Sequence, residues 1–117
     1  MKRRVITILL LSAILLQCFG CAKNENSPVK VYLRDQPETA VGLSNKAVDY
    51  MVTLWNEAHW KKGSIKLTGD YIFLYNNRII HFISEQCLLN DFENNRHCYI
   101  SEDQRDHINS LLNTAFS

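Results

Sequence analysis

The sequence predicts a small α+β domain in which an antiparallel sheet packs with two helices. The first observation behind this prediction is a dense stretch of alternating, strand-like sequence between residues 64 and 84, interrupted by short turns. The second is a pair of amphipathic segments with helix-capping residues, one before and one after that stretch. We expect the element order β-α-β-β-β-(β)-α, with the three central strands forming a meander.

Three segments are expected along the chain: a leader at 1–20, a tether at 21–28 and the domain itself at 29–117. Without the leader 97 residues remain, enough for one small domain with a modest core but not for two. The leader holds three of the 13 Lys and Arg residues, so 10 basic residues face 12 acidic ones in the remainder. Because the basic residues are scattered, the composition does not indicate a nucleic-acid-binding protein.

The leader has the plan of a secretory signal. Lys2, Arg3 and Arg4 form its basic start, and residues 5–16 form an apolar run of 12 residues. This run is too short to cross a bilayer, which takes about 20 residues. Gly20 supplies the small residue that a processing peptidase needs just before its cleavage site. The pattern therefore predicts export.

The end of the leader, Cys18-Phe19-Gly20-Cys21, resembles the lipobox of bacterial lipoproteins. In that family the final cysteine is acylated, with palmitate among its chains, and becomes the new N-terminus. The resemblance implies lipidation at Cys21. The family usually has leucine and a small residue where this chain has Cys18 and Phe19, so ordinary cleavage to a soluble periplasmic product is the alternative. Since Ala22 is not the aspartate that favours inner-membrane retention in the family, the resemblance implies the periplasmic face of the outer membrane.

The first elements of the domain follow from local patterns. Residues 29–34 alternate as a half-buried strand, and residues 35–42, with a proline and a glycine, predict a loop. A helix is predicted from the N-cap Ser44 to Lys62, with Gly63 just past its end. Its apolar face comprises Ala47, Val48, Met51, Leu54, Trp55 and Ala58.

The central stretch predicts strands at 64–68, 71–75 and 78–84, with Asn76-Asn77 as a two-residue turn. Pairing Tyr75 with Arg78 makes both faces of the hairpin apolar, which is unusual for an antiparallel sheet in a small domain. Three explanations are open: helices on both faces, a partial barrel, or an aromatic binding surface. One face carries Tyr71, Phe73, Tyr75, Ile80 and Phe82, and the other carries Ile72, Leu74, Ile79, His81 and Ile83. The candidate partner-binding residues are Tyr71, Phe73, Tyr75 and Phe82.

The rest of the chain predicts a polar loop at 85–96, a possible short strand at 98–100 and a final helix ending near Ala115. The helix begins at a capping box, Ser101 to Gln104. In an exported protein, Cys87 and Cys98 form an even pair once Cys21 is acylated and Cys18 is removed with the leader. We expect a disulfide between Cys87 and Cys98.

No motif for catalysis, cofactor binding or metal binding occurs in the sequence, so neither an enzyme nor a cofactor is expected. Four histidines, His59, His81, His97 and His107, lie on different predicted elements. His81 is the best candidate for a catalytic base, because the hairpin register places it on an apolar face. A hydrogen-bonded structural histidine is the more ordinary interpretation.

These patterns favour a membrane-anchored lipoprotein of the periplasm that acts by protein binding. The first hypothesis is an accessory for envelope or secretion assembly, similar to pilotins in size and anchoring, whose partner is an envelope protein. The second is an immunity or inhibitor lipoprotein that neutralises a toxin or a wall-degrading enzyme through Asp91, Phe92 and Glu93. The third, an enzyme, would need His81 beside a carboxylate. The sequence indicates neither a small-molecule substrate nor a nucleic acid.

Overall fold

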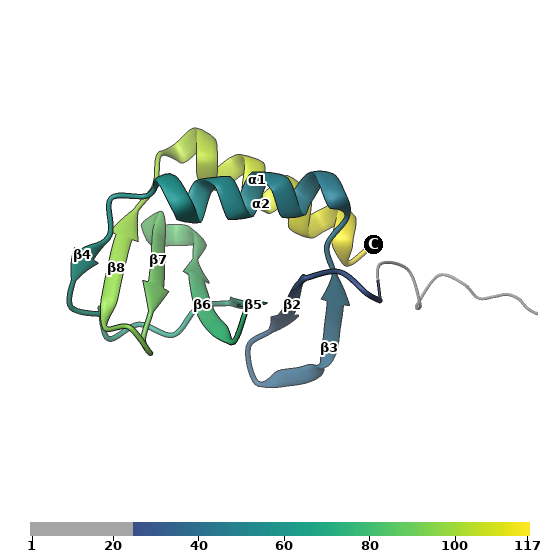
Figure 1. The fold of residues 1–117 in the computed structure, drawn as a ribbon, viewed down its shortest axis with the longest axis horizontal. Coiled ribbons are helices and arrows are strands. Elements are labelled where there is room, and N and C mark those ends of the chain that lie inside the picture. The colour runs from purple at the N-terminus through teal and green to yellow at the C-terminus, as the bar shows by residue number, and fades with distance from the viewer. Residues whose placement is uncertain (1–24) are drawn as a thin grey trace, which may run out of the picture.

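The computed structural model describes residues 25–117. The described chain is an α+β structure in which two helices cover one face of a seven-stranded antiparallel sheet, with strand order β3-β2-β5-β6-β7-β8-β4 (Figure 1). The predicted class is therefore confirmed, although the sheet is larger than expected. In chain order the elements are β2 (Val29–Leu33), β3 (Gln36–Gly42), α1 (Asn45–Glu57), β4 (Lys61–Lys62), β5 (Tyr71–Tyr75), β6 (Arg78–Ile83), the 3-10 turn η2 (Ser84–Gln86), β7 (Leu88–Asp91), β8 (Arg96–Tyr99) and α2 (Glu102–Ala115).

Both helices begin where their capping residues predict. The Ser44 hydroxyl accepts a hydrogen bond from the Ala47 N–H at 3.3 Å at the start of α1. The capping box of α2 is complete, since the Ser101 hydroxyl accepts from the Gln104 N–H at 3.0 Å and the Gln104 side chain accepts from the Ser101 N–H at 2.8 Å. The helices touch where the Tyr50 and His107 rings lie 4.2 Å apart between centroids.

α1 ends at Glu57, five residues before the predicted end at Lys62. The Trp60 indole N–H turns back and donates to the Trp55 carbonyl at 2.9 Å, which satisfies one of the acceptors at the helix end. The Arg96 guanidinium lies 4.4 Å from the centre of the Trp60 ring. Lys61 and Lys62 then pair with β8 as a short edge strand instead of extending the helix.

The central hairpin has the predicted register, with Tyr75 opposite Arg78. Asn76 and Asn77 both adopt positive φ, 48° and 63°, as a two-residue turn of this kind requires. Its aromatic face meets the helices. The core between the sheet and the helices includes Val29, Val31, Met51, Leu54, Trp55, Phe73, Ile80, Phe82, Leu89, Cys98, Ile108 and Leu112.

Two segments predicted as loops contain strands. Residues 36–42 form the edge strand β3, which folds back on β2 through Asp35 at a φ of 62°. An edge position tolerates Pro37, which cannot donate to a ladder. The segment 85–96 contains η2, β7 and the turn to β8, so its backbone groups are largely taken up by the sheet.

Candidate binding surface

The aromatic hairpin face is not an exposed surface, because the helices cover it. Phe73 and Phe82 are 1% and 0% exposed. Tyr71 packs against Phe116 of the C-terminal end, with ring centroids 5.7 Å apart. Tyr75 lies at the same distance, 5.7 Å, from the Trp55 ring of α1. Burial makes Phe73 and Phe82 core residues, which contradicts their predicted role in partner binding, whereas Tyr71 and Tyr75 are half-buried residues that pack against the core.

The opposite sheet face is crossed by residues 63–70, which we call the strap. The strap leaves the edge strand β4 and reaches β5 in the middle of the sheet, so it passes over β8, β7 and β6. Asn90, fully buried on β7, holds its centre: the amide nitrogen donates to the carbonyls of Ile65 at 2.7 Å and Leu67 at 3.1 Å, and the amide oxygen accepts from the Ile65 N–H at 2.9 Å. Because side chains satisfy its backbone, the strap is not a strand, and the strand predicted at 64–68 was wrong.

Two histidines hold the strap on either side of Asn90. On β8, His97 Nδ1 hydrogen-bonds with the Gly63 carbonyl oxygen. On β6, His81 Nδ1 accepts a hydrogen bond from the Gly69 N–H at 3.1 Å. His81, Asn90 and His97 are successive partners in the sheet register and so form one polar row beneath the strap. The row explains polar side chains in the middle of an otherwise apolar face.

Close packing of the strap accounts for the second apolar face of the hairpin. A Cβ atom on Gly69 would lie 2.7 Å from the Phe82 backbone nitrogen, so only glycine permits this approach. Ile72, Ile83 and Leu88, which share the strap side, are 3%, 8% and 1% exposed and lie outside the helix-side core cluster. Of the explanations left open by the sequence, helices cover one face and a length of irregular chain covers much of the other.

Three large apolar side chains are exposed on the strap side. Within residues 25–117 they are Leu67, Phe92 and Tyr99, which are 41%, 39% and 56% exposed. The Phe92 ring stands edge-on to the His81 ring at 4.8 Å, and the Tyr99 ring stands edge-on to the His97 ring at 5.6 Å. We call this side, with its three exposed apolar residues, the strap face. The sequence does not reveal this face, because residues 64–68 alternate in the manner of a strand.

The predicted disulfide is absent, and Cys87 and Cys98 are free thiols. Cys98 pairs with Leu89, whereas the Cys87 carbonyl accepts from the Ile100 N–H at 2.9 Å, so the cysteines are offset by two positions along adjacent chains. Such an offset is about 7 Å, beyond the reach of a disulfide. Cys98 is buried in the core, where desolvation raises its pKa to about 11. The Cys87 sulfur lies 3.7 Å from Arg105 Nη1.

Burial removes one of the three residues, Asp91, Phe92 and Glu93, on which the inhibitor hypothesis relies. Asp91 is fully buried, and its Oδ2 accepts hydrogen bonds from Arg96 Nε at 3.0 Å and Asn94 Nδ2 at 2.9 Å. Its carboxylate thus fixes the β7–β8 turn. Phe92 and Glu93 remain exposed at the tip.

His81 is placed as a structural histidine. Burial lowers its pKa below the usual value for histidine, which favours the neutral ring that accepts from Gly69. Across residues 25–117 no group of three or more His, Cys, Asp and Glu side chains is arranged to hold a metal ion. The site geometry thus supports a role for His81 in fixing the strap.

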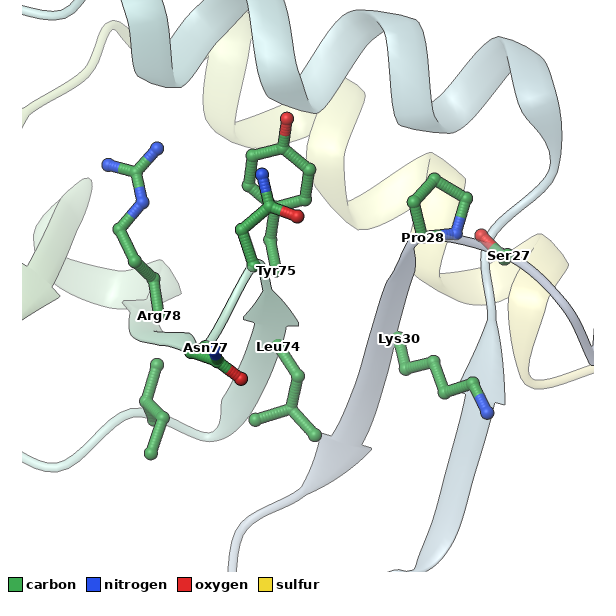
Figure 2. A pocket seen from close by; sticks show the side chains of 9 residues that line it. Ser27, Pro28, Lys30, Leu74, Tyr75, Asn77 and Arg78 are labelled. Carbon is green, nitrogen blue, oxygen red and sulfur yellow. The ribbon is translucent and has the colours of Figure 1, made fainter.

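A cleft of about 450 Å³ opens beside the start of β2 (Figure 2). Lys30, Leu74 and Ile79 are partners in one row of the sheet register, next to the row that holds the strap and on the same side. Figure 2 shows Tyr75 and Arg78 directed toward the helices, and Leu74 and Lys30 directed away from them. The cleft is lined by Ser27, Pro28, Lys30, Leu74, Tyr75, Asn76, Asn77, Arg78 and Ile79.

No family model, no curated protein and no solved structure matches the chain. The lipidation site Cys21 lies outside the described residues and stays a prediction from the lipobox resemblance. Among residues 25–117 neither helix is long and apolar enough to cross a membrane.

Proposed function

We propose that this chain is a lipid-anchored protein on the periplasmic face of the outer membrane that binds another envelope protein through the strap face. It would act as an accessory in envelope or secretion assembly, in the manner of a pilotin, and without catalysis. The observation that carries the proposal is the exposure of Leu67, Phe92 and Tyr99 on the strap side of the sheet, the face that no helix covers (Figure 1).

The strap face has the properties of a binding surface. Aromatic side chains with rigid surroundings dominate protein interfaces, because little conformational entropy is lost when they are buried. Phe92 and Tyr99 each rest on a histidine ring, and both of those rings are hydrogen-bonded to the strap backbone. A partner would thus meet a fixed apolar surface bordered by polar backbone.

A cross-linking pull-down from intact envelopes tests the proposal. We compare the native chain with Tyr99→Ser and Leu67→Ser, and use Asn56→Ser, on the exposed side of α1, as the matched control. One stoichiometric envelope protein should be captured by the native chain and the control. Capture should fall about tenfold or more with Tyr99→Ser, as for an interfacial hot spot. Equal capture by all four chains would contradict the strap face as the binding surface.

The same experiment separates the inhibitor alternative, which the exposed Phe92 and Glu93 at the β7–β8 tip favour. For an inhibitor the captured protein is a secreted toxin or a wall-degrading enzyme. Phe92→Ser and Glu93→Gln would each reduce the capture of this target, whereas Leu67→Ser would leave it unchanged. Cys21→Ser tests anchoring separately, because the proposed protein should then leave the membrane fraction.

A further inference from the structure

We propose that the envelope protein bound at the strap face meets it with a surface on which acidic side chains lie beside apolar ones. This inference rests on the proposed function and adds the chemistry of the partner to it. Three observations support it: lysines next to exposed apolar residues, opposite charge on the two faces of the domain, and the absence of large exposed apolar residues from the helix face within residues 25–117.

An unpaired lysine lies beside two of the three exposed apolar residues of the strap face. Lys61 of β4 is the register partner of His97, so the two side chains share the strap side, with Tyr99 one diagonal position, about 7–8 Å, from Lys61. Lys66 is next to Leu67 in the strap. Both lysines are exposed, and neither forms an ion pair within residues 25–117. A partner that buries Tyr99 and Leu67 therefore brings its own side chains close to two cations without counterions.

Acidic groups around the strap do not neutralise these lysines. Asp70, the acidic residue of the strap, lies 3.6 Å from the Arg34 guanidinium. Glu93 is exposed next to Phe92, in the turn between β7 and β8. The partner's carboxylates are therefore expected at Lys61 and in the strap rather than at the β7–β8 turn.

The helix face carries the opposite charge. Two basic residues, a lysine and an arginine, face five acidic ones in the two helices. The residues are Lys46 and Arg105 against Asp49, Glu57, Glu102, Asp103 and Asp106. An acidic partner is repelled by this face and attracted by the strap face, so the charge distribution orients the encounter as well as the final contact.

A second copy of this chain and an anionic bilayer are also negatively charged, but each fits the strap face less well. The helix face of a second copy would supply carboxylates without large exposed apolar side chains, because all three of those within residues 25–117 lie on the strap side. Recognition of an anionic bilayer usually takes a cluster of about four to eight basic residues. A separate protein can supply carboxylates and apolar side chains together.

Zero-length cross-linking in intact envelopes tests the chemistry of the partner. A carbodiimide condenses a lysine amine with a carboxylate in contact with it and takes up the water released, so the adduct identifies an acidic side chain directly. We expect adducts of Lys61 and Lys66 with Asp or Glu residues of one envelope protein. Lys62, on the same strand but on the helix side opposite Arg96, is the matched control and should form no adduct with that protein.

Reversal of charge provides a second measurement. Lys61→Glu with Lys66→Glu should lower capture of that protein about tenfold or more, because like charges then face each other across the interface. Lys46→Glu with Lys62→Glu makes the same change of charge on the helix side and should leave capture unchanged.

Three results would each overturn the inference: capture without an adduct from either lysine, equal capture by the two double variants, or adducts only to a second copy of this chain. A photoreactive residue at Thr68, exposed in the strap, tests the lipid alternative, and labelling of phospholipid in place of protein would also overturn the inference. If Tyr99→Ser lowers capture and charge reversal does not, the proposed function stands without this inference. If the native chain captures no envelope protein, the proposed function itself is wrong.

Discussion

Burial sets the reactivity of the two described cysteines. Cys98 is 1% exposed, and desolvation raises its pKa to about 11, so at about pH 8 it is a protonated thiol out of reach of reagents. Cys87 is half-buried. Titration with an aromatic disulfide reagent should therefore detect one fast thiol in the folded domain, and a second, slow one that becomes fast in denaturant.

The control for this titration is Cys87→Ser, which should remove the fast thiol and leave the slow one. A folded domain that yields neither thiol before reduction would show that the disulfide predicted from the sequence forms after all.

His81 makes the stability of the strap depend on pH. Burial lowers the pKa of His81 below its ordinary value of 6.5, so the unfolded chain binds a proton more readily than the folded one. The stabilising contribution is complete above about pH 6.5 and declines as the pH falls through the lower folded pKa. Protonation at Nδ1 would also cost the bond from the Gly69 N–H. Urea unfolding should therefore give a lower free energy of unfolding at a pH below the folded pKa of His81 than at a pH above 6.5.

In the matched comparison, His81→Gln should flatten this pH dependence, while His59→Gln, at an exposed position after α1, should retain it. An unchanged slope in His81→Gln would place the titrating group elsewhere.

Among the elements, the strap depends most on one side chain. Asn90 makes three hydrogen bonds to strap backbone from a fully buried position. Asn90→Ala leaves those backbone groups unpaired and should lower the free energy of unfolding by about 2–4 kcal/mol. It should also expose the bond after Lys66 to trypsin. Ser64→Ala, which removes the surface hydrogen bond of 3.3 Å from Ser64 Oγ to Asn95 Oδ1, should cost less than about 1 kcal/mol. Equal losses in the two variants would mean that the strap is not held by Asn90.

Elements whose signals are local could be predicted from the sequence. Ser44 and Ser101 mark helix starts because capping is satisfied within three residues, and Asn76-Asn77 determine the hairpin because both tolerate positive φ. The pairing of Tyr75 with Arg78 follows from that turn. These parts of the fold needed no knowledge of distant contacts.

Elements that depend on distant partners could not be predicted in this way. Residues 64–68 alternate like a strand, but their backbone groups bond to Asn90, some 25 positions later in the chain. β3 has a proline and a glycine, typical of a loop, and becomes a strand because β2 lies beside it. The early end of α1 depends on Trp60, which folds back on Trp55. In each case a tertiary contact overrides the local pattern.

At the scale of the whole molecule, the sequence correctly predicts that both faces of the hairpin are apolar, but it does not predict which part of the chain covers each face. Amphipathic helices fit either face equally well, because the period of a helix carries no information about which side of a sheet it will meet. The candidate site was consequently placed on the face that became the core. Leu67 joins the exposed Phe92 and Tyr99 on that face only once the strap is in place.

The assignment of the aromatic hairpin face to the core and of the strap face to solvent can be tested by the free energy of unfolding of two variants. Phe73→Ala should lower the free energy of unfolding by about 3–5 kcal/mol, because it empties a fully packed site between the sheet and Trp55. Tyr99→Ala, at 56% exposure, should change it by about 0.5 kcal/mol or less. Denaturant midpoints and slopes of the two variants provide the comparison. A stable Phe73→Ala together with an unfolded Tyr99→Ala would reverse the assignment of the two faces.

The order of strands in the sheet also governs how the chain completes its fold as it emerges N-terminus first, from a ribosome or a translocation channel. The β2–β3 hairpin appears early, but the other side of β2 waits for β5, since Val29 pairs with Tyr75, 46 positions later. Until then β2 presents an unpaired apolar edge of the kind that invites association between chains. The core receives Ile108 and Leu112 only from α2. A nascent chain of this sequence therefore cannot complete its core until α2 has been delivered, and during that interval the open edge of β2 is exposed to association with other chains.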